Sequence, residues 1–254
     1  MALTGNRIIL TGGSGGLGKL VAAELLREGA DLTVVSRTLI GRGDDQVRHI
    51  AIDLSTVNGI AEASTVVARE EPDILVNMAG VQYFGPAESQ SFEDMHGSYM
   101  VNLVAPAALC RACLSAMKRR NAGQIANIGS ICGSIPLAHF AAYSSAKAGL
   151  RAFSEALRRE LVGTEISVTY VAPRAVRTPM LTPEIQQYAD LTRMNIDPPE
   201  IISKRIVTAI KHQKKDVYIG FPERLFIRLN ALMPRLVDAA VAGNDRKAMK
   251  LFAA

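Results

Sequence analysis

The sequence contains no tryptophan, few aromatic residues and only three cysteines among 254 residues. It also lacks any run of about 18 or more uncharged apolar residues, so a membrane-spanning helix is not expected. The stretch from Met1 to Arg7 lacks the long apolar core of a secretory signal, and cytoplasmic residence is the simplest expectation. An odd number of thiols builds no disulfide framework and suits a reducing compartment.

Two of the cysteines, Cys110 and Cys113, have C-x-x-C spacing inside a helical pattern. No second cysteine pair or histidine cluster accompanies them, and the third thiol, Cys132, stands apart in the sequence. Buried helix packing is therefore favoured over metal binding or redox chemistry, and no metal site is predicted.

The net charge of +5 is unevenly placed along the chain. From Ser203 onward there are 11 Lys and Arg residues against four Asp and Glu residues, so this segment carries +7 and the remainder is close to neutral. Such asymmetry indicates an anionic partner or, more frequently, a solvated basic surface. No nucleic-acid partner is predicted.

Apolar strand-like runs alternate with helical patterns, and 48% of the residues are hydrophobic. This order predicts one large α/β domain with a parallel sheet, whose ligands bind at the carboxyl ends of the strands. We assign residues 1–220 to a Rossmann-like doubly wound sheet and residues 221–254 to an amphipathic helical extension of the same domain. The expected strands are Arg7–Leu10, Leu32–Val35, Val47–Ile52, Ile74–Asn77, Gln124–Ile128, Ile166–Val171 and Val217–Ile219.

A glycine-rich stretch joins the first strand to a helical pattern. Glycines at such a turn allow positive φ and let a pyrophosphate approach the helix N-terminus, so a nucleotide site is the natural hypothesis. A flexible turn without a ligand is the structural alternative. Two frames fit, G-x-G-x-x-G on Gly13, Gly15 and Gly18, and T-G-x-x-x-G-x-G on Thr11, Gly12, Gly16 and Gly18.

Three further polar residues fall at the ends of predicted strands. Arg37 follows the second strand, whereas Asp31 precedes it. An arginine in this position accommodates a 2′-phosphate, so the sequence favours NADP over NAD, the alternative being that Arg37 is only a loop charge. Asp53 and Asn77 close the next two strands, at the edge where ligands bind.

The stretch around Tyr143 and Lys147 carries the strongest chemical signal. Small residues and the apolar spacing of the positions that follow predict a helix, so these two side chains, four residues apart, share one face. A cation beside a phenol lowers the phenol's pKa and makes it a useful proton donor and acceptor. A tyrosine and a lysine at this spacing are also common on helices without any catalytic role.

Three other segments are less definite. The helical region from Phe92 to about Arg119 contains Pro106, which implies a kink or an irregular turn, and Asn102, which on its own indicates a structural hydrogen bond. From Met180 to Pro199 the composition is irregular, with Thr182-Pro183 and Asp197-Pro198-Pro199 as breakers, and a loop of this length is typical of a substrate lid. The segment from Phe221 to Val237 predicts an amphipathic helical hairpin, for which packing over the pocket or a subunit contact is favoured over a membrane surface.

Taken together, these motifs resemble the short-chain dehydrogenase/reductase family over about residues 6–220. The motifs are the T-G-x-x-x-G-x-G turn, Asn77-Met78-Ala79-Gly80, Asn102, Ser130 and Tyr143-x-x-x-Lys147, in that order. The resemblance implies that Tyr143 is the catalytic acid and base, that Lys147 lowers its pKa and holds the nicotinamide ribose, and that Ser130 binds the substrate oxygen. Asn102 would position a water in a proton relay.

The resemblance also implies a set of cofactor contacts. In it, glycines form the phosphate turn, Asp53 reaches the adenine and Thr178 the carboxamide. Two departures are Met78 in a largely structural motif and Arg174, where the family commonly has glycine. The expected contacts are Gly12, Ser14, Gly16, Leu17, Gly18, Ser36, Arg37, Asp53, Leu54, Asn77, Ala79, Gly80, Tyr143, Lys147, Pro173, Val176 and Thr178.

The function expected from the sequence is NADP(H)-dependent hydride transfer between the nicotinamide and a carbonyl or secondary alcohol. The apolar tail and the long lid favour a hydrophobic substrate, such as a 3-oxoacyl or steroid-like ketone, and the tail leaves peripheral membrane contact open. A nucleotide-binding protein of the same fold without catalysis is the alternative. The resemblance implies a homodimer or homotetramer.

Overall fold

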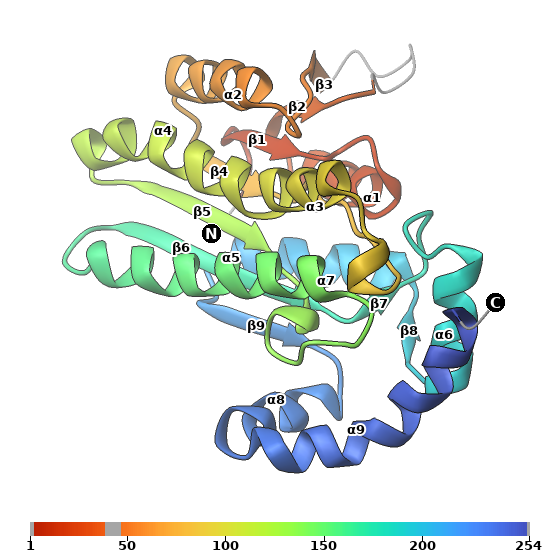
Figure 1. The fold of residues 1–254 in the computed structure, drawn as a ribbon. Helices are drawn as coiled ribbons and strands as arrows, with labels where there is room; N and C mark the ends of the chain where they lie inside the picture. The colour runs from red at the N-terminus through yellow and green to blue at the C-terminus, as the bar shows by residue number, and fades with distance from the viewer. Residues whose placement is uncertain (1–2, 39–46, 253–254) are drawn as a thin grey trace.

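The computed structural model describes residues 3–38 and 47–252, and its centre is a parallel sheet of seven strands. The strand order is β3-β2-β1-β4-β5-β6-β9, so β2 and β3 lie on one side of β1 and the strands from β4 onward lie on the other. All seven strands are parallel, which places their carboxyl ends at one edge (Figure 1). All seven predicted strands are confirmed. Their bounds are β1 Arg7–Thr11, β2 Asp31–Ser36, β3 Val47–Ala51, β4 Ile74–Asn77, β5 Gly123–Ile128, β6 Ile166–Pro173 and β9 Asp216–Ile219.

Two helical layers cover the sheet, because successive strand residues point to opposite faces. Ile8 and Leu10 pack into the core under α1 (Gly16–Arg27) and α7 (Pro199–Lys211). Ile9 packs into the core on the other face, under α2 (Val57–Glu70), α4 (Ala105–Arg120) and α5 (Ala141–Glu160). The doubly wound architecture predicted from the alternation is therefore confirmed.

The helical run Phe92–Arg120 is interrupted in its middle. It consists of α3 (Phe92–Tyr99), a π-helical turn (Met100–Val104) and α4, with Pro106 in the first turn of α4. Proline has no N–H to donate to the preceding turn, and the wider π turn accommodates this loss, as the predicted irregularity requires. By length and composition the run could cross a membrane, but 56% of its most apolar window is buried, as in a core helix.

Cys110 and Cys113 lie on α4 with no exposed surface, and all three cysteines are free. The prediction that the C-x-x-C pair serves helix packing is confirmed. Burial raises the pKa of the Cys113 thiol to about 12, so this thiol stays protonated and unreactive.

The segment predicted as an irregular lid is more ordered than its composition indicates. It contains α6 (Pro183–Thr192) and β8 (Ile196–Asp197), which pairs in parallel with β7 (Ala175–Val176). Thr182 caps α6 by accepting a hydrogen bond from the Ile185 N–H at 3.4 Å, which gives a proline-rich stretch a defined helix start. The expectation of an irregular loop is therefore wrong in its local structure.

The carboxyl-terminal part forms two helices, as predicted. They are α8 (Glu223–Leu232) and α9 (Pro234–Met249), followed by a single 3₁₀ turn at Lys250–Phe252. Helix α9 runs beside α6 and returns the chain to the edge where the strands end (Figure 1). Short 3₁₀ turns also occur at Ala87–Ser89 and Ile131–Gly133.

Candidate active site

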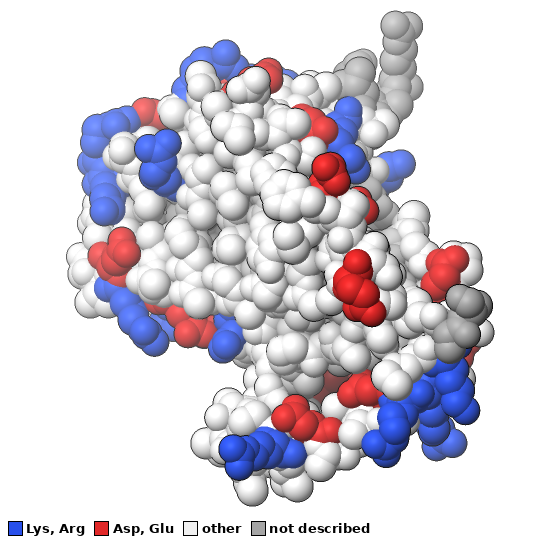
Figure 2. All heavy atoms as spheres, viewed as in Figure 1, with Lys and Arg blue, Asp and Glu red and all other residues white. Residues whose placement is uncertain are grey.

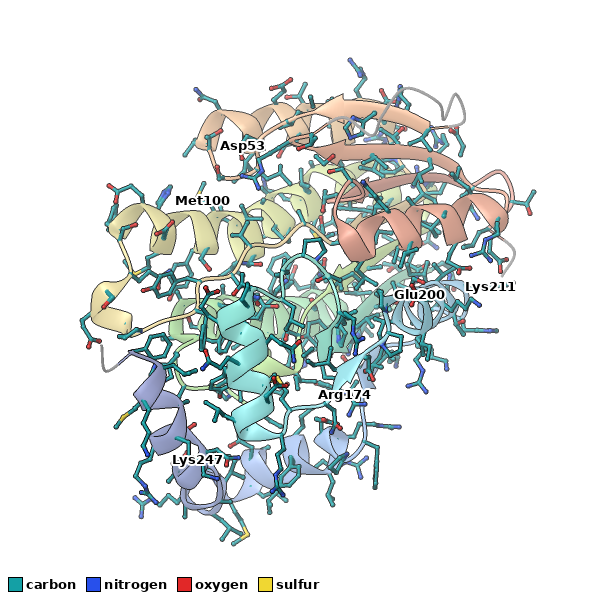
Figure 3. All side chains as sticks on the ribbon, turned by 90° about the vertical axis from the view of Figure 1, so that its right-hand side faces the viewer. Asp53, Met100, Arg174, Glu200, Lys211 and Lys247 are labelled. Carbon is teal, nitrogen blue, oxygen red and sulfur yellow. The ribbon has the colours of Figure 1, made fainter. Side chains whose placement is uncertain are left out.

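The site is built at the edge where the parallel strands end. Figure 3 looks onto this edge, with Asp53 in its upper part and Arg174 below. The turns after β1, β2, β4 and β5 all open here because parallel strands carry their carboxyl ends on the same side. The start of α5, with Tyr143, lies against the 3₁₀ turn after β5.

The glycine turn after β1 is pressed against the turn after β4. Gly12 has φ +74°, and a Cβ there would lie 2.7 Å from the Ala79 Cα. The Thr11 hydroxyl accepts hydrogen bonds from the N–H groups of Met78 (2.9 Å) and Ala79 (3.1 Å), which ties the two turns together. Only glycine fits at this approach.

The contacts of the other glycines decide between the two sequence frames. A Cβ on Gly18 would collide with the Gly12 carbonyl oxygen, and one on Gly16 would lie 2.7 Å from the Pro179 Cδ. Of the two glycines found only in the other frame, a Cβ on Gly13 would also be close, at 2.8 Å from a Val34 methyl group, but one on Gly15 would make only an ordinary contact at 3.5 Å. The T-G-x-x-x-G-x-G frame therefore describes the turn better than G-x-G-x-x-G.

Helix α1 begins at the end of this turn, and no side chain caps its N-terminus. Its N-cap, Gly15, offers no side-chain hydrogen bond, and the first turn of α1 contains no acidic residue. The first N–H groups of a helix attract an anion when nothing caps them. Ser14 and Leu17 are partly exposed in the same stretch, and Leu17 packs against the core.

The turns after β2 and β3 bring the predicted adenosine-end residues together. The pKa of Asp53 is held below its usual value by hydrogen bonds from the N–H and hydroxyl of Ser55 and by the positive charge of Arg37. The Ser36 hydroxyl is buried and lies 2.7 Å from the His49 Nε2. Leu54 is buried, whereas Arg37 and Asp53 are both exposed in this corner.

The Asn77 side chain takes part in a buried hydrogen-bond chain inside the protein. Its Nδ2 donates to the Asn127 Oδ1 at 2.9 Å, and the Asn127 amide donates to the Ser154 hydroxyl at 2.9 Å. All three side chains are buried, so Asn77 faces the interior and only its backbone is available to a ligand at the edge. The cofactor contact predicted for Asn77 stays a prediction, as do those of Ala79 and Gly80, which lie beside Gly12 and beside Asn102 and Lys147.

Asn102 is fully buried in the π-helical turn. Its amide donates to the carbonyl oxygens of Val81 (2.7 Å) and Ser98 (2.8 Å). The Oδ1 of Asn102 has no hydrogen-bond partner among the described residues. A Cβ built on Gly80 would lie 3.1 Å from this oxygen and 3.7 Å from the Lys147 Nζ, so both atoms lie beside Gly80. This orphaned acceptor faces the site, where a donor such as water would satisfy it.

Tyr143, Ser130 and Lys147 come together as predicted. The Lys147 Nζ is 5.8 Å from the centre of the Tyr143 ring, and the Ser130 side chain is close enough to Tyr143 to lower the pKa of the phenol. Lys147 is only 4% exposed and donates to the Ile128 carbonyl at 3.0 Å. Burial lowers the pKa of Lys147 to about 8, partly offset by the nearby Cys132.

The net shift of the Tyr143 pKa is opposite to the one expected from Lys147 alone. Burial raises the pKa of Tyr143 well above its usual range, Cys132 raises it further, and the Ser130 side chain lowers it. Desolvation of the charged phenolate outweighs the favourable contacts because the ammonium is directed at the Ile128 carbonyl. The phenol is therefore protonated at neutral pH and available as a proton donor.

The loop after β6 explains the unusual Arg174. Its guanidinium donates to both oxygens of Asp197 (2.9 and 2.8 Å) and to both oxygens of Glu223 (3.0 and 3.1 Å). These contacts join the end of β6 to β8 and to the start of α8. Pro173 is buried beside Arg174 at the end of β6, Val176 lies in β7, and Thr178 packs against Gly16.

Sequence reasoning missed a cluster of rings beside Tyr143. We call it the aromatic cluster; it consists of Phe84, His139, Phe140, Tyr188 and Phe252. These residues come from four separate segments, so no local periodicity could indicate that they meet. Tyr143 packs at the border of the cluster, with its ring centre 6.5 Å from that of Phe140.

Comparison with known proteins agrees with this geometry. Residues 6–189 match the sequence profile of the short chain dehydrogenase family. The chain is 31% identical to the ketoacyl reductase HetN of Nostoc sp. over 86% of its own length and 79% of HetN. It is also 31% identical to mouse 3-ketodihydrosphingosine reductase, over 82% of its own length and 69% of that protein.

A short-chain dehydrogenase from Streptomyces avermitilis has the same fold, with a TM-score of 0.77 and 25% identity over 96% of this chain and 98% of its own. Other solved proteins of this fold are described with NADP or with NADH bound. The family profile covers well over half of the sequence, including the glycine turn and the Tyr143 helix. We conclude that the chain belongs to the short-chain dehydrogenase/reductase family of oxidoreductases.

Proposed function

We propose that this chain is an NADP(H)-dependent oxidoreductase that interconverts a carbonyl and a secondary alcohol on a hydrophobic substrate. The observation that carries the proposal is the meeting of Tyr143, Ser130 and Lys147 at the edge where the strands end. The proposal takes residues 1–220 as the cofactor-binding and catalytic part. Residues 221–254 extend the same domain, since Ala248 and Leu251 pack with Phe140.

The residues around the glycine turn fit a nicotinamide dinucleotide. The close approach at Gly12 and the uncapped first turn of α1 leave backbone N–H groups for a pyrophosphate. Asp53 would meet the adenine end and Thr178 the carboxamide end. When bound, the cofactor supplies or accepts a hydride at the substrate carbon. The remaining lining of this site would come from Ser14, Gly16, Leu17, Gly18, Ser36, Leu54, Ala79, Gly80, Pro173 and Val176.

Each catalytic side chain has a defined task in carbonyl reduction. The Tyr143 hydroxyl donates its proton to the substrate oxygen as that oxygen gains negative charge, while the Ser130 hydroxyl donates a hydrogen bond to the same oxygen. The raised pKa of Tyr143 keeps the proton on the phenol until it is needed. The Lys147 ammonium stabilises the phenolate that remains, and the free Oδ1 of Asn102 holds a water that returns a proton.

The preference for NADP(H) is supported by Arg37. It follows β2, and its charge reaches Asp53, so a guanidinium is present at the corner where a 2′-phosphate would lie. We expect tighter binding of NADPH than of NADH in calorimetric titration, and loss of this preference in Arg37→Ala. Arg111→Ala, which removes an exposed arginine from α4, is the matched control. Equal affinity for both nucleotides in the wild type would overturn the NADP assignment.

A hydrophobic substrate is supported by the apolar surroundings of Tyr143. Phe140, Leu137 and Leu181 pack near its ring, and ketoacyl and 3-ketodihydrosphingosine reductases are among the relatives. We expect long-chain 3-oxoacyl thioesters or steroid-like ketones to be reduced with higher kcat/KM than acetone or dihydroxyacetone. A clear preference for the small hydrophilic ketones would contradict this part of the proposal.

Peripheral contact with an anionic membrane is supported by α8. None of its residues is buried, and Leu225 and Leu232 are 60% and 82% exposed. At the bottom of the face in Figure 2, Lys and Arg side chains lie over α8 and the last turns of α9, with Asp and Glu side chains beside them. Apolar residues beside cations fit the headgroup region of an anionic bilayer.

Co-sedimentation with phosphatidylglycerol and phosphatidylcholine vesicles tests this contact. We expect binding to the anionic vesicles only, and loss of binding in Leu225→Glu. Val162→Glu, at a position 82% exposed away from α8, should bind as the wild type does. Binding that is unchanged in Leu225→Glu would place the contact elsewhere.

We further propose a homodimer or homotetramer formed through the layer of α3, α4 and α5. Phe92 and Val104 in this layer are 69% and 42% exposed, so two large apolar side chains are available to a second copy of the chain. Light scattering after gel filtration should give a mass of two or four chains, and Val104→Glu should lower it. The free buried thiols support residence in the reducing cytoplasm.

A further inference from the structure

The turn Lys250–Phe252 closes the aromatic cluster from the far end of the sequence. The ring centre of Phe252 lies 4.6 Å from that of His139 and 5.2 Å from that of Phe84. Leu251 packs against the same cluster, and Ala248, at the end of α9, has no exposed surface. The end of α9 is thus seated on the cluster.

A continuous row of rings leads from Tyr143 to Phe252. The ring centre of Phe140 is 6.5 Å from that of Tyr143 and 4.8 Å from that of Phe84, and Phe84 in turn contacts Phe252. Phe140 itself is buried, whereas Tyr143, Phe84 and Phe252 keep part of their surface exposed. A substrate held at Tyr143 whose apolar group lay over these exposed ring surfaces would meet Phe252 as the last ring. The length of the apolar group therefore decides whether the contact is made.

The segment that carries Phe252 is less firmly held than the other walls. Along α9 only Val237 and Ala248 are buried, whereas Phe140 and Tyr188 are themselves buried beneath the cluster. A long hydrogen bond from the Asn244 amide to the Thr192 carbonyl, at 3.5 Å, also connects α9 to the end of α6. An element with so few buried contacts opens at low cost.

We propose that Phe252 is a specificity-determining residue, the movable end wall of the substrate site, which limits the length of the apolar group that the enzyme accepts. This inference rests on the proposed function, because it needs the substrate oxygen at Tyr143. In the closed arrangement short 3-oxo substrates fit in front of the ring. Longer ones must displace the Lys250–Phe252 turn.

The test compares a short and a long probe, the acetoacetyl and 3-oxododecanoyl thioesters of N-acetylcysteamine, with NADPH as the reductant. In Phe252→Ala the ratio of kcat/KM for the long probe over the short probe should rise about tenfold. Tenfold corresponds to about 1.4 kcal/mol, or the burial of roughly two additional methylene groups. In Phe252→Trp the ratio should fall.

Controls separate this role from a general effect on folding. Phe221→Ala removes the same side chain from a position that is 79% exposed, and it should leave the ratio unchanged. NADPH affinity should be the same in all four proteins, and Phe252→Leu provides a milder variant if the alanine form is unstable.

The outcomes distinguish the two proposals. The role of Phe252 alone would be overturned if the wild-type enzyme reduced both probes and the long-to-short ratio of kcat/KM stayed unchanged in Phe252→Ala, Phe252→Leu and Phe252→Trp. A wild-type protein that binds NADPH but reduces neither probe would overturn the proposed function, and this inference with it.

Discussion

Replacing Arg174 with methionine removes the cation from a site where two carboxylates are held against it. The guanidinium makes four hydrogen bonds of 2.8–3.1 Å to Asp197 and Glu223. All three side chains are only 16% exposed, so water replaces the lost contacts poorly. The variant would leave two negative charges facing each other between β8 and α8.

The size of the effect follows from these contacts. Removing one partner of a buried ion pair costs about 3–5 kcal/mol, and the remaining exposure of these side chains favours the lower end of that range. We therefore expect Arg174→Met to lower the free energy of unfolding by about 3 kcal/mol. For a chain of this size that corresponds to roughly 6–12 °C in Tm.

Urea unfolding and a thermal scan measure this loss. Arg177→Met, at an exposed arginine in the same loop, should change the free energy of unfolding by less than about 0.5 kcal/mol. The triple variant with Asp197→Asn and Glu223→Gln should recover part of the loss because no unpaired charge remains. A loss of unfolding free energy in Arg174→Met as small as that of the Arg177 control would refute the stabilising role of the Arg174 ion pairs.

Three further predictions concern catalysis, stability and cofactor binding. Carbonyl reduction should slow as the pH rises through about 8, where the buried Lys147 ammonium loses its proton, and Lys147→Arg should lack this limb of the pH–rate profile. Lys147 should also make the free energy of unfolding depend on pH. Because burial lowers its pKa from 10.5, the charged ammonium destabilises the folded state, and urea unfolding should show this cost disappearing between pH 8 and 10.5. Gly12→Ala should weaken NADPH binding at least about tenfold because its Cβ would strike Ala79. Gly5→Ala has the same φ of +74° in open space and should leave calorimetric NADPH affinity unchanged.

The strands and the catalytic helix could be predicted from sequence because each is encoded locally. Apolar runs such as Ile74–Asn77 mark buried parallel strands, and the spacing of Tyr143 and Lys147 places them on one helix face. The order of the strands then brings their ends to one edge. The positions of Arg37, Asp53 and Ser130 at that edge follow from topology alone.

The features that escaped prediction depend on contacts between distant segments. Phe252 contacts Phe84, which is far from it in the sequence. Arg174 contacts Glu223 because the start of α8 lies beside the loop after β6. Nothing in the neighbouring sequence of these residues indicates their partners. The pKa of Tyr143 was misjudged for a related reason, since burial is set by all surrounding elements and Lys147 is only one of them.

The central claim is that Tyr143 donates the proton during carbonyl reduction, and Tyr143→Phe tests it most directly. The measurement is NADPH oxidation with 3-oxododecanoyl-N-acetylcysteamine by the variant, by the wild type and by Tyr99→Phe, which removes a phenol that hydrogen-bonds to Ser145 on the same helix. We predict a loss of at least about 10³-fold in kcat/KM for Tyr143→Phe, with unchanged NADPH affinity and near-normal activity in the control. Near-normal turnover by Tyr143→Phe would contradict the account.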